Sequence, residues 1–237
     1  MPEDISANLH EIRIRIGSAA ERAMRSPNEV KLVAVSKTHP PEVLRAAIEA
    51  GATALGENKV QEAEGKIDEL GRDRAEWHLI GHLQSNKARK AVQLFDVIQS
   101  VDSIELAERL ERICFEEGRA VLQVLVQVDL AGEETKSGIA EGNVTGLVEF
   151  LNGCERLRLD GLMVLPPFFE DAEATRPFFV RLRSIRDRLA AEGFFHGRPG
   201  ELSMGMSHDF ETAVEEGATI VRVGTAIFGA RSAGRQS

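Results

Sequence analysis

The sequence of 237 residues contains no tyrosine, one tryptophan and two cysteines. Cys114 and Cys154 do not have the spacing of a metal site or a redox pair, which favours reduced thiols in a cytoplasmic protein. No apolar run approaches membrane-spanning length, and the N-terminus lacks the apolar core of a signal peptide. Acidic residues outnumber basic ones by 38 to 29, and the resulting net charge of −9 disfavours binding to nucleic acid or to an anionic membrane.

Helical and extended patterns alternate along the chain. Apolar residues at steps of three and four predict an amphipathic helix over about 3–25. Over about 31–230, short apolar strands alternate with amphipathic helices, and a long loop at 130–139 carries Glu133, Glu134 and Lys136, which we interpret as solvated. The eight strand candidates begin at Lys31, Thr53, Glu76, Asp96, Val121, Leu159, Glu201 and Thr219.

Eight such units predict an α/β protein with one domain over 1–237, a (β/α)8 TIM barrel. A doubly wound open sheet is the alternative. Against it, the first strand–helix turn at 36–40 has no glycine and cannot hold a dinucleotide pyrophosphate.

Lys37 ends the first strand just before Pro40 and Pro41. Side chains at i and i+2 share a face of a strand, so Val33, Val35 and Lys37 point the same way. An ammonium at the end of an apolar face is costly unless it is paired or reacts. From this stretch alone, a reactive lysine and a lysine that bends into solvent are equally good interpretations.

Two small loops follow the seventh and eighth strands, at Gly205-Met206-Ser207 and at Gly224-Thr225. In this fold the loops after these two strands often bind phosphate with backbone N–H groups, hydroxyls and a helix N-terminus. Ser207 is also a natural N-cap for the helix that follows, so simple capping is the alternative for either loop alone. Both loops together, opposite a lysine at a strand end, favour a phosphate site.

Arg222 shares a strand face with Gly224 and is expected inside the barrel beneath it. A guanidinium there needs an acceptor, such as a phosphate, a carboxylate or a heteroaromatic nitrogen. The alternative is a structural ion pair with Glu57 or Asp129.

A lysine amine opposite a phosphate site suggests a phosphorylated aldehyde. Pyridoxal 5′-phosphate (PLP) fits, with a Schiff base to the lysine. A class I aldolase would use the same groups with a sugar phosphate, and the residues alone do not separate the two. His78 and His82 are four residues apart, but a strand that ends at Gly81 separates them, so we predict ordinary barrel residues and no metal site.

Ordered motifs from about Val33 to Arg231 resemble one family. They are Val33-Ala34-Val35-Ser36-Lys37-Thr38, Gly56-Glu57-Asn58 with Val60-Gln61-Glu62, Trp77-His78-Leu79-Ile80-Gly81 with Leu83-Gln84-Ser85-Asn86-Lys87, Lys136-Ser137-Gly138, Gly161-Leu162-Met163, Leu202-Ser203-Met204-Gly205-Met206-Ser207 with Asp209, and Val221-Arg222-Val223-Gly224-Thr225-Ala226-Ile227-Phe228-Gly229. Together they resemble the YggS/PROSC family of pyridoxal phosphate homeostasis proteins, whose fold is that of the alanine racemase N-terminal domain.

The resemblance implies that Lys37 carries PLP as an aldimine. It also implies that Ser207, Gly224 and Thr225 hold the phosphate and that Arg222 lies by the ring nitrogen. The further residues that would line the ring are Asn58, His82 and Met163. Three positions depart from the family pattern and concern ring-side contacts, namely His39, Lys59 and Asp129.

The resemblance also implies a carrier or regulator of PLP, without catalytic turnover. Racemases of this fold place a tyrosine from a second domain opposite the lysine, and here we expect no such domain and find no tyrosine. An arginine at the pyridine nitrogen keeps that nitrogen unprotonated, which makes a poor electron sink. We therefore expect a monomer that exchanges PLP with apo-forms of PLP-dependent enzymes. An amino-acid racemase-like enzyme with His82 as its base is the alternative.

Overall fold

Eight parallel strands close into a barrel in the computed structural model, which describes residues 4–132 and 137–229. Each strand pairs with its neighbours in chain order, β4 pairs with β5, and β1 pairs with β9 to complete the ring. The barrel strands are β1 (Lys31–Val35), β2 (Ala54–Glu57), β3 (Glu76–Leu79), β4 (Val97–Val101), β5 (Leu122–Asp129), β7 (Leu157–Val164), β8 (Glu201–Ser203) and β9 (Ile220–Val223). The predicted (β/α)8 barrel is confirmed, and the open sheet is excluded.

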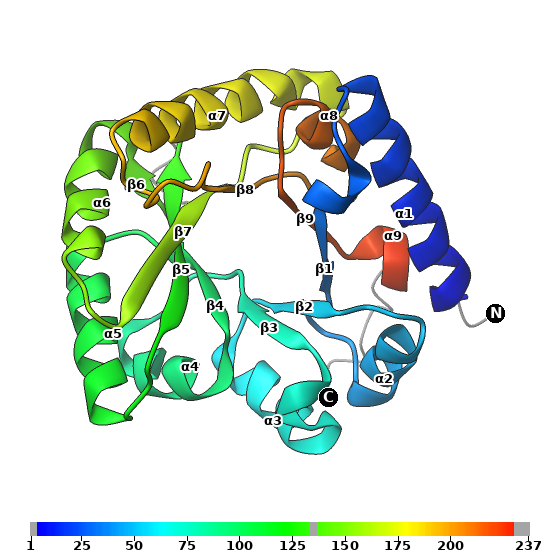
Figure 1. Ribbon diagram of the computed structural model, residues 1–237. Coiled ribbons are helices and arrows are strands. Elements are labelled where there is room, and N and C mark those ends of the chain that lie inside the picture. The colour runs from blue at the N-terminus through cyan, green and yellow to red at the C-terminus, as the bar shows by residue number, and fades with distance from the viewer. Residues whose placement is uncertain (1–3, 133–136, 230–237) are drawn as a thin grey trace.

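Helices surround the barrel on its outside (Figure 1). They are α1 (Ile5–Arg22), α2 (Pro41–Glu49), α3 (Val60–Leu70), α4 (Ala88–Leu94), α5 (Ile104–Glu116), α6 (Val144–Asn152), α7 (Arg176–Ala191), α8 (Phe210–Glu215) and α9 (Thr225–Phe228). Residues at the N-termini fix the start of several helices. The Asp4 carboxylate caps α1, the Ser103 hydroxyl caps α5, and Pro41 is the first residue of α2. None of the helices within the described ranges is long and apolar enough to cross a membrane.

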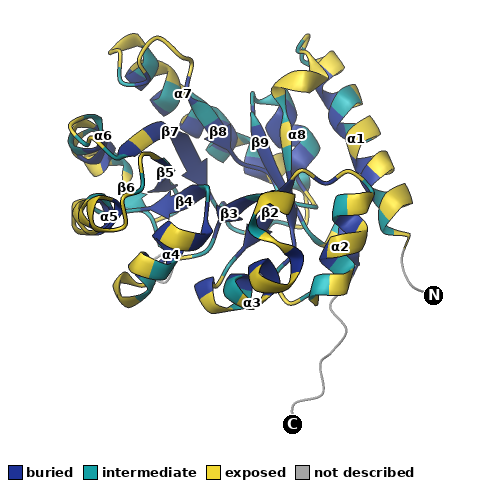
Figure 2. Ribbon diagram, turned by 60° about the horizontal axis from the view of Figure 1, so that its bottom comes forward, coloured by how far each residue is buried: buried dark blue, intermediate teal, exposed yellow. Residues whose placement is uncertain are grey.

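The alternation of side chains along the strands divides the buried residues into two layers. Figure 2 shows the strands buried at the centre and the helices exposed on their outer faces. Outward-facing residues such as Leu55, Ile98 and Val221 pack against the helices. The inner apolar cluster is smaller and consists of Val33, Ala54, Val97, Leu125, Met163 and Ile220. Inward-facing residues near the C-terminal ends of the strands, such as Val35, face the mouth of the barrel.

The N-terminal helix α1 packs against α8 and α9, far away in sequence (Figure 1). Its Asn8 amide donates to the carbonyl of Ile227, and its Arg15 forms an ion pair with Glu211. The last strand is followed by a helix of four residues only, and α1 covers the barrel on that side. It thereby braces the two helices that follow β8 and β9.

The expected loop at 130–139 ends in a short additional strand, β6 (Ile139–Ala140), which pairs with β5. Glu133, Glu134 and Lys136 lie outside the described residues. Both cysteines are free thiols, and burial raises the pKa of each to about 11. Thiols with such pKa values stay protonated at neutral pH and are poor nucleophiles.

Candidate functional site

A cavity of about 670 Å³ opens at the C-terminal ends of the strands, where barrels of this type carry their functional sites. It is lined by seven of the eight residues that the sequence singles out, namely Lys37, Asn58, His82, Ser207, Arg222, Gly224 and Thr225. Val35, Ile80 and Leu165 add apolar walls. Residues that are up to 188 positions apart in the sequence, from Lys37 to Thr225, therefore face one space.

Lys37 follows β1 in a tight turn and is half-buried at the cavity wall. The next residue, Thr38, has a φ of 69°, which is unfavourable for a β-branched residue. Its N–H donates to the carboxylate of Glu62, and the N–H of His39 donates to the carbonyl of Ser36. These contacts hold the turn that directs Lys37 into the cavity.

An ion-pair cluster supports this turn from outside the barrel wall. Lys66 Nζ lies 2.7 Å from Glu57 Oε1 and 2.9 Å from Glu62 Oε1, and it also donates to the carbonyl of Ser36. The Ser36 hydroxyl donates to Glu57 over 2.6 Å. Burial raises the pKa of Glu57 above its ordinary value, although the Lys66 ammonium opposes the rise. For Glu62 burial also raises the pKa, but hydrogen bonds from Lys66 and Thr38 outweigh it, and the pKa is lowered.

The Ser207 hydroxyl ties the two small loops together. Its oxygen accepts from the N–H of Gly224 over 3.1 Å and from that of Ala226 over 3.4 Å. The expected N-cap role of Ser207 in the following helix is wrong. Asp209 is the residue at that position, and its carboxylate accepts from the Met206 N–H over 2.6 Å. Ser207 therefore orders the loop after β9 rather than the helix after β8.

Arg222 lies inside the barrel, 2% exposed, and reaches the cavity lining. Its guanidinium donates to Ser203 Oγ over 2.5 Å and to the carbonyl of Val164 over 2.8 Å. Burial lowers its pKa to about 10, opposed by the Asp209 carboxylate. The alternative of an ion pair with Glu57 or Asp129 is wrong.

The two carboxylates proposed for that pair have other partners. Glu57 pairs with Lys66, and the Asp129 carboxylate accepts from the N–H groups of Ala131 and Gly132.

Comparison with known proteins places the chain in a family. Residues 7–232 match the family described as "Alanine racemase, N-terminal domain". A pyridoxal phosphate homeostasis protein of Aquifex aeolicus (strain VF5) is 43% identical over 223 residues, covering 94% of this chain and 96% of the relative. This chain belongs to the pyridoxal phosphate homeostasis protein family.

Solved structures of similar proteins support this family assignment. PipY of Synechococcus elongatus PCC7942, a structure described as having PLP bound, matches with a TM-score of 0.80 and 41% identity, covering 95% of this chain and all of PipY. Alanine racemase from Corynebacterium glutamicum matches with a TM-score of 0.69, covering the whole of this chain and 63% of the racemase. At 17% identity that second match concerns the fold alone.

Among the residues that line this cavity, Asn58 and His82 come from the ends of neighbouring strands. A Cβ atom on Gly81 would lie 2.4 Å from the carbonyl oxygen of Asn58, so only glycine allows these two loops to pack so closely. His82 is about half exposed, and its Nδ1 lies 3.6 Å from Asp102 Oδ2. Burial raises the pKa of Asp102, with the His82 ring opposing the rise.

Met163 is the expected ring-side residue that the cavity lining does not include. It is fully buried in the inner apolar cluster, and Leu165, two positions later, packs on that cluster and lines the cavity instead. Of the three positions that depart from the family pattern, His39 lines the cavity and stacks near Phe228, with ring centroids 5.0 Å apart. Lys59 is exposed at the start of α3 and is absent from the lining.

Sequence reasoning missed two sets of residues. Phe168 and His208 line the mouth with ring centroids 5.5 Å apart, and only the Pro166-Pro167 pair signalled a special loop there. The second set is Gln99 and Ser203, which are buried and hydrogen-bonded to each other inside the barrel. Gln99 also contacts His78, which is a buried barrel residue as expected. No group of residues suited to a metal ion occurs among residues 4–132 and 137–229.

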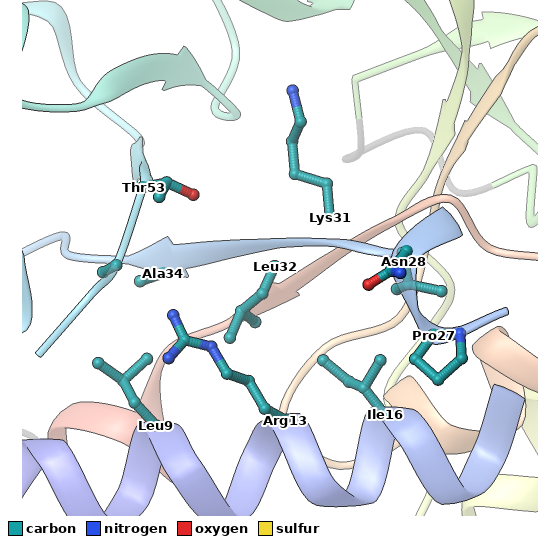
Figure 3. Close-up of a pocket in the computed structure, with 11 residues that line it drawn as sticks. Leu9, Arg13, Ile16, Pro27, Asn28, Lys31, Leu32, Ala34 and Thr53 are labelled. Atoms are coloured by element: carbon teal, nitrogen blue, oxygen red, sulfur yellow. The ribbon is translucent and has the colours of Figure 1, made fainter.

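A second cavity, of about 360 Å³, lies at the other end of β1, between that strand and α1 (Figure 3). Leu9 and Ile16 of α1 face Leu32 across it, and the Arg13 guanidinium donates to the carbonyl of Gly51. None of the predicted site residues reaches it. The cavity at the strand C-termini is therefore the candidate site.

Proposed function

We propose that this protein binds PLP in the cavity at the strand C-termini and supplies it to other proteins, without catalytic turnover of its own. The observation that carries the proposal is that Lys37 faces the two loops joined by Ser207, with Arg222 at the base of the same cavity. When bound, PLP supplies an aldehyde that condenses reversibly with amines. PipY, 41% identical, has a structure described as having PLP bound, which supports the assignment.

The residues present fit this ligand. The Ser207 and Thr225 side chains and the Gly224 backbone line one cavity, and the bonds from the Gly224 and Ala226 N–H groups to Ser207 Oγ hold these two loops together, as a phosphate site requires. Lys37 provides the amine, and Arg222 provides a donor for a ring nitrogen. Apolar walls at Ile80 and Leu165 suit the faces of a flat ring better than they suit the polyol chain of a sugar phosphate, so we favour PLP over the substrate of an aldolase.

Two features favour a carrier over an enzyme. The sequence has no tyrosine to serve as the second base of a racemase. The donor at the ring nitrogen is a guanidinium, which does not hand over its proton even with a pKa of about 10, so the ring would be a poor electron sink. The racemase-like alternative has one observation in its favour, the His82 ring near the Asp102 carboxylate at the cavity mouth. Cytoplasmic location and a monomeric state remain predictions from the sequence.

Transfer of PLP to an unrelated apo-enzyme tests the proposal. We expect the PLP-loaded protein to restore that enzyme's activity within minutes to hours. Lys37→Ala, loaded without a covalent link, should donate faster because only the phosphate and ring contacts remain. Lys59→Ala is the matched control, since this lysine is near the site but exposed and outside the lining. A wild-type protein that kept its PLP indefinitely against excess apo-enzyme would contradict the carrier role.

A further inference from the structure

Hydrogen-bonded polar side chains form a chain across the interior of the barrel, a region that apolar residues usually fill in this fold. Arg222 donates to Ser203 Oγ over 2.5 Å, and Ser203 Oγ donates to Gln99 Oε1 over 2.6 Å. Gln99 Nε2 lies 2.8 Å from His78 Nδ1. All four residues are buried, so their polar atoms depend on one another for partners.

This chain continues from His78 to the N-terminal end of the barrel. His78 Nε2 is 3.1 Å from Glu76 Oε2, and Lys31 Nζ is 2.6 Å from the same oxygen. The hydrogen bond with His78 is the largest cause that lowers the pKa of Glu76, to about 2, so this group is an ionised acceptor. Figure 3 shows Leu32 pointing from β1 toward α1 and Lys31 pointing to the opposite side.

From Arg222 to Glu76, each group donates a hydrogen bond to the next one. An amide nitrogen only donates, so Gln99 makes Nδ1 of His78 an acceptor. An ionised carboxylate only accepts, so the proton of His78 lies on Nε2 and points at Glu76. His78 thereby fixes which end of the Gln99 amide faces Ser203. The Ser203 hydroxyl donates its proton to Gln99 Oε1. Ser203 Oγ can therefore accept a hydrogen bond from Arg222.

We propose that His78, Gln99 and Ser203 are positioning residues that aim the Arg222 guanidinium at the ring nitrogen of the bound ligand. This inference rests on the proposed function, which supplies the ligand. The contacts with Ser203 and with the Val164 carbonyl engage two of the three guanidinium nitrogens. Because the guanidinium is planar, two fixed nitrogens fix the orientation of the whole group.

A ligand that lacks the ring nitrogen tests this proposal. Equilibrium binding is measured for PLP and for its 1-deaza analogue, in which a C–H group replaces that nitrogen. One hydrogen bond from a charged donor predicts that the wild-type protein prefers PLP about ten- to hundred-fold. Ser203→Ala and His78→Leu should lose this preference, while they bind the analogue as tightly as the wild type does. That unchanged affinity for the analogue shows that the variants are folded.

His78→Asn is the matched control, because an asparagine oxygen can replace Nδ1 as the acceptor for Gln99, and it should keep most of the preference. A Ser203→Ala protein with the full preference for PLP would overturn the inference. Failure of the wild type to bind either compound would instead refute the proposed function, and this inference with it. Nitrogen-15 NMR of His78 in the ligand-free protein is an independent measurement. A proton on Nε2 alone supports the chain, whereas a proton on Nδ1 contradicts it.

Discussion

Replacing Lys66 with methionine tests the ion-pair cluster that supports the Lys37 turn. Lys66 is buried between Glu57 and Glu62, and Glu57 is fully buried. Methionine keeps most of the side-chain length but removes the charge, which leaves the Glu57 carboxylate without its counter-ion. Breaking a buried pair in this way costs about 3–5 kcal/mol. That is a large part of the roughly 5–15 kcal/mol by which a typical protein is stable.

The loss of stability in Lys66→Met should depend on pH, and the sign follows from the pKa of Glu57. Burial already raises the pKa of Glu57, and removal of the Lys66 ammonium, which opposes that rise, raises it further. A carboxyl group with a raised pKa binds its proton more tightly in the folded protein than in the unfolded chain. The Lys66→Met protein should therefore lose most stability near pH 8 and regain part of it as the pH falls and Glu57 becomes protonated.

Urea unfolding of the ligand-free protein at pH 8 and pH 5.5 measures both effects. The double variant Glu57→Gln with Lys66→Met should recover much of the loss at pH 8, because no buried charge remains. Lys90→Met removes an exposed ion pair with Glu64 and is the control, with little change expected at either pH. A Lys66→Met loss that is equal at both pH values, or a double variant no more stable than Lys66→Met, would refute this reasoning.

Three further predictions concern the ligand and the barrel. Ser207→Ala and Thr225→Ala should each weaken PLP about ten- to hundred-fold more than unphosphorylated pyridoxal, measured by equilibrium titration, whereas equal losses would mean that both residues only order the loops. Gly161→Ala should destabilise the protein in thermal unfolding, because the new Cβ would lie 2.1 Å from the carbonyl oxygen of Glu201; an unchanged melting temperature would contradict this. Amino acids incubated in D2O with the PLP-loaded protein should show no Cα exchange at enzymatic rates by NMR, and exchange at a rate on the order of tens per second that disappears in His82→Ala would favour the racemase-like alternative.

Most of the fold could be predicted because its signals are local. The alternation of Val33, Val35 and Lys37 placed the lysine at the cavity, and apolar residues at steps of three and four predicted the N-terminal helix, which the structure has at Ile5–Arg22. The inward direction of Arg222 follows from the same alternation. These predictions need only the periodicity of one element and the rule that strand C-termini meet at one end of the barrel.

The rest depends on how strands are staggered, which a single segment does not encode. Arg222 meets Ser203 and Val164 because of the register of β7, β8 and β9, and β5 and β7 pair with a shift near Gly161. Met163 lies in the inner apolar cluster and is absent from the cavity lining, although we expected it to line the ring. Serine is a common N-cap residue, so Ser207 was a reasonable prediction. In the folded protein its hydroxyl oxygen instead accepts from the N–H of Gly224 in the loop after β9.

Locating the covalent link to PLP tests the central claim most directly. The protein is loaded with PLP, the link is reduced with borohydride, and the labelled peptide is identified by mass spectrometry, with Lys37→Ala and Lys59→Ala treated in parallel. We predict a yellow protein whose pyridoxyl label lies on Lys37, a Lys59→Ala protein that behaves the same, and a Lys37→Ala protein without label. A label on another lysine, together with covalent uptake by Lys37→Ala, would contradict the account.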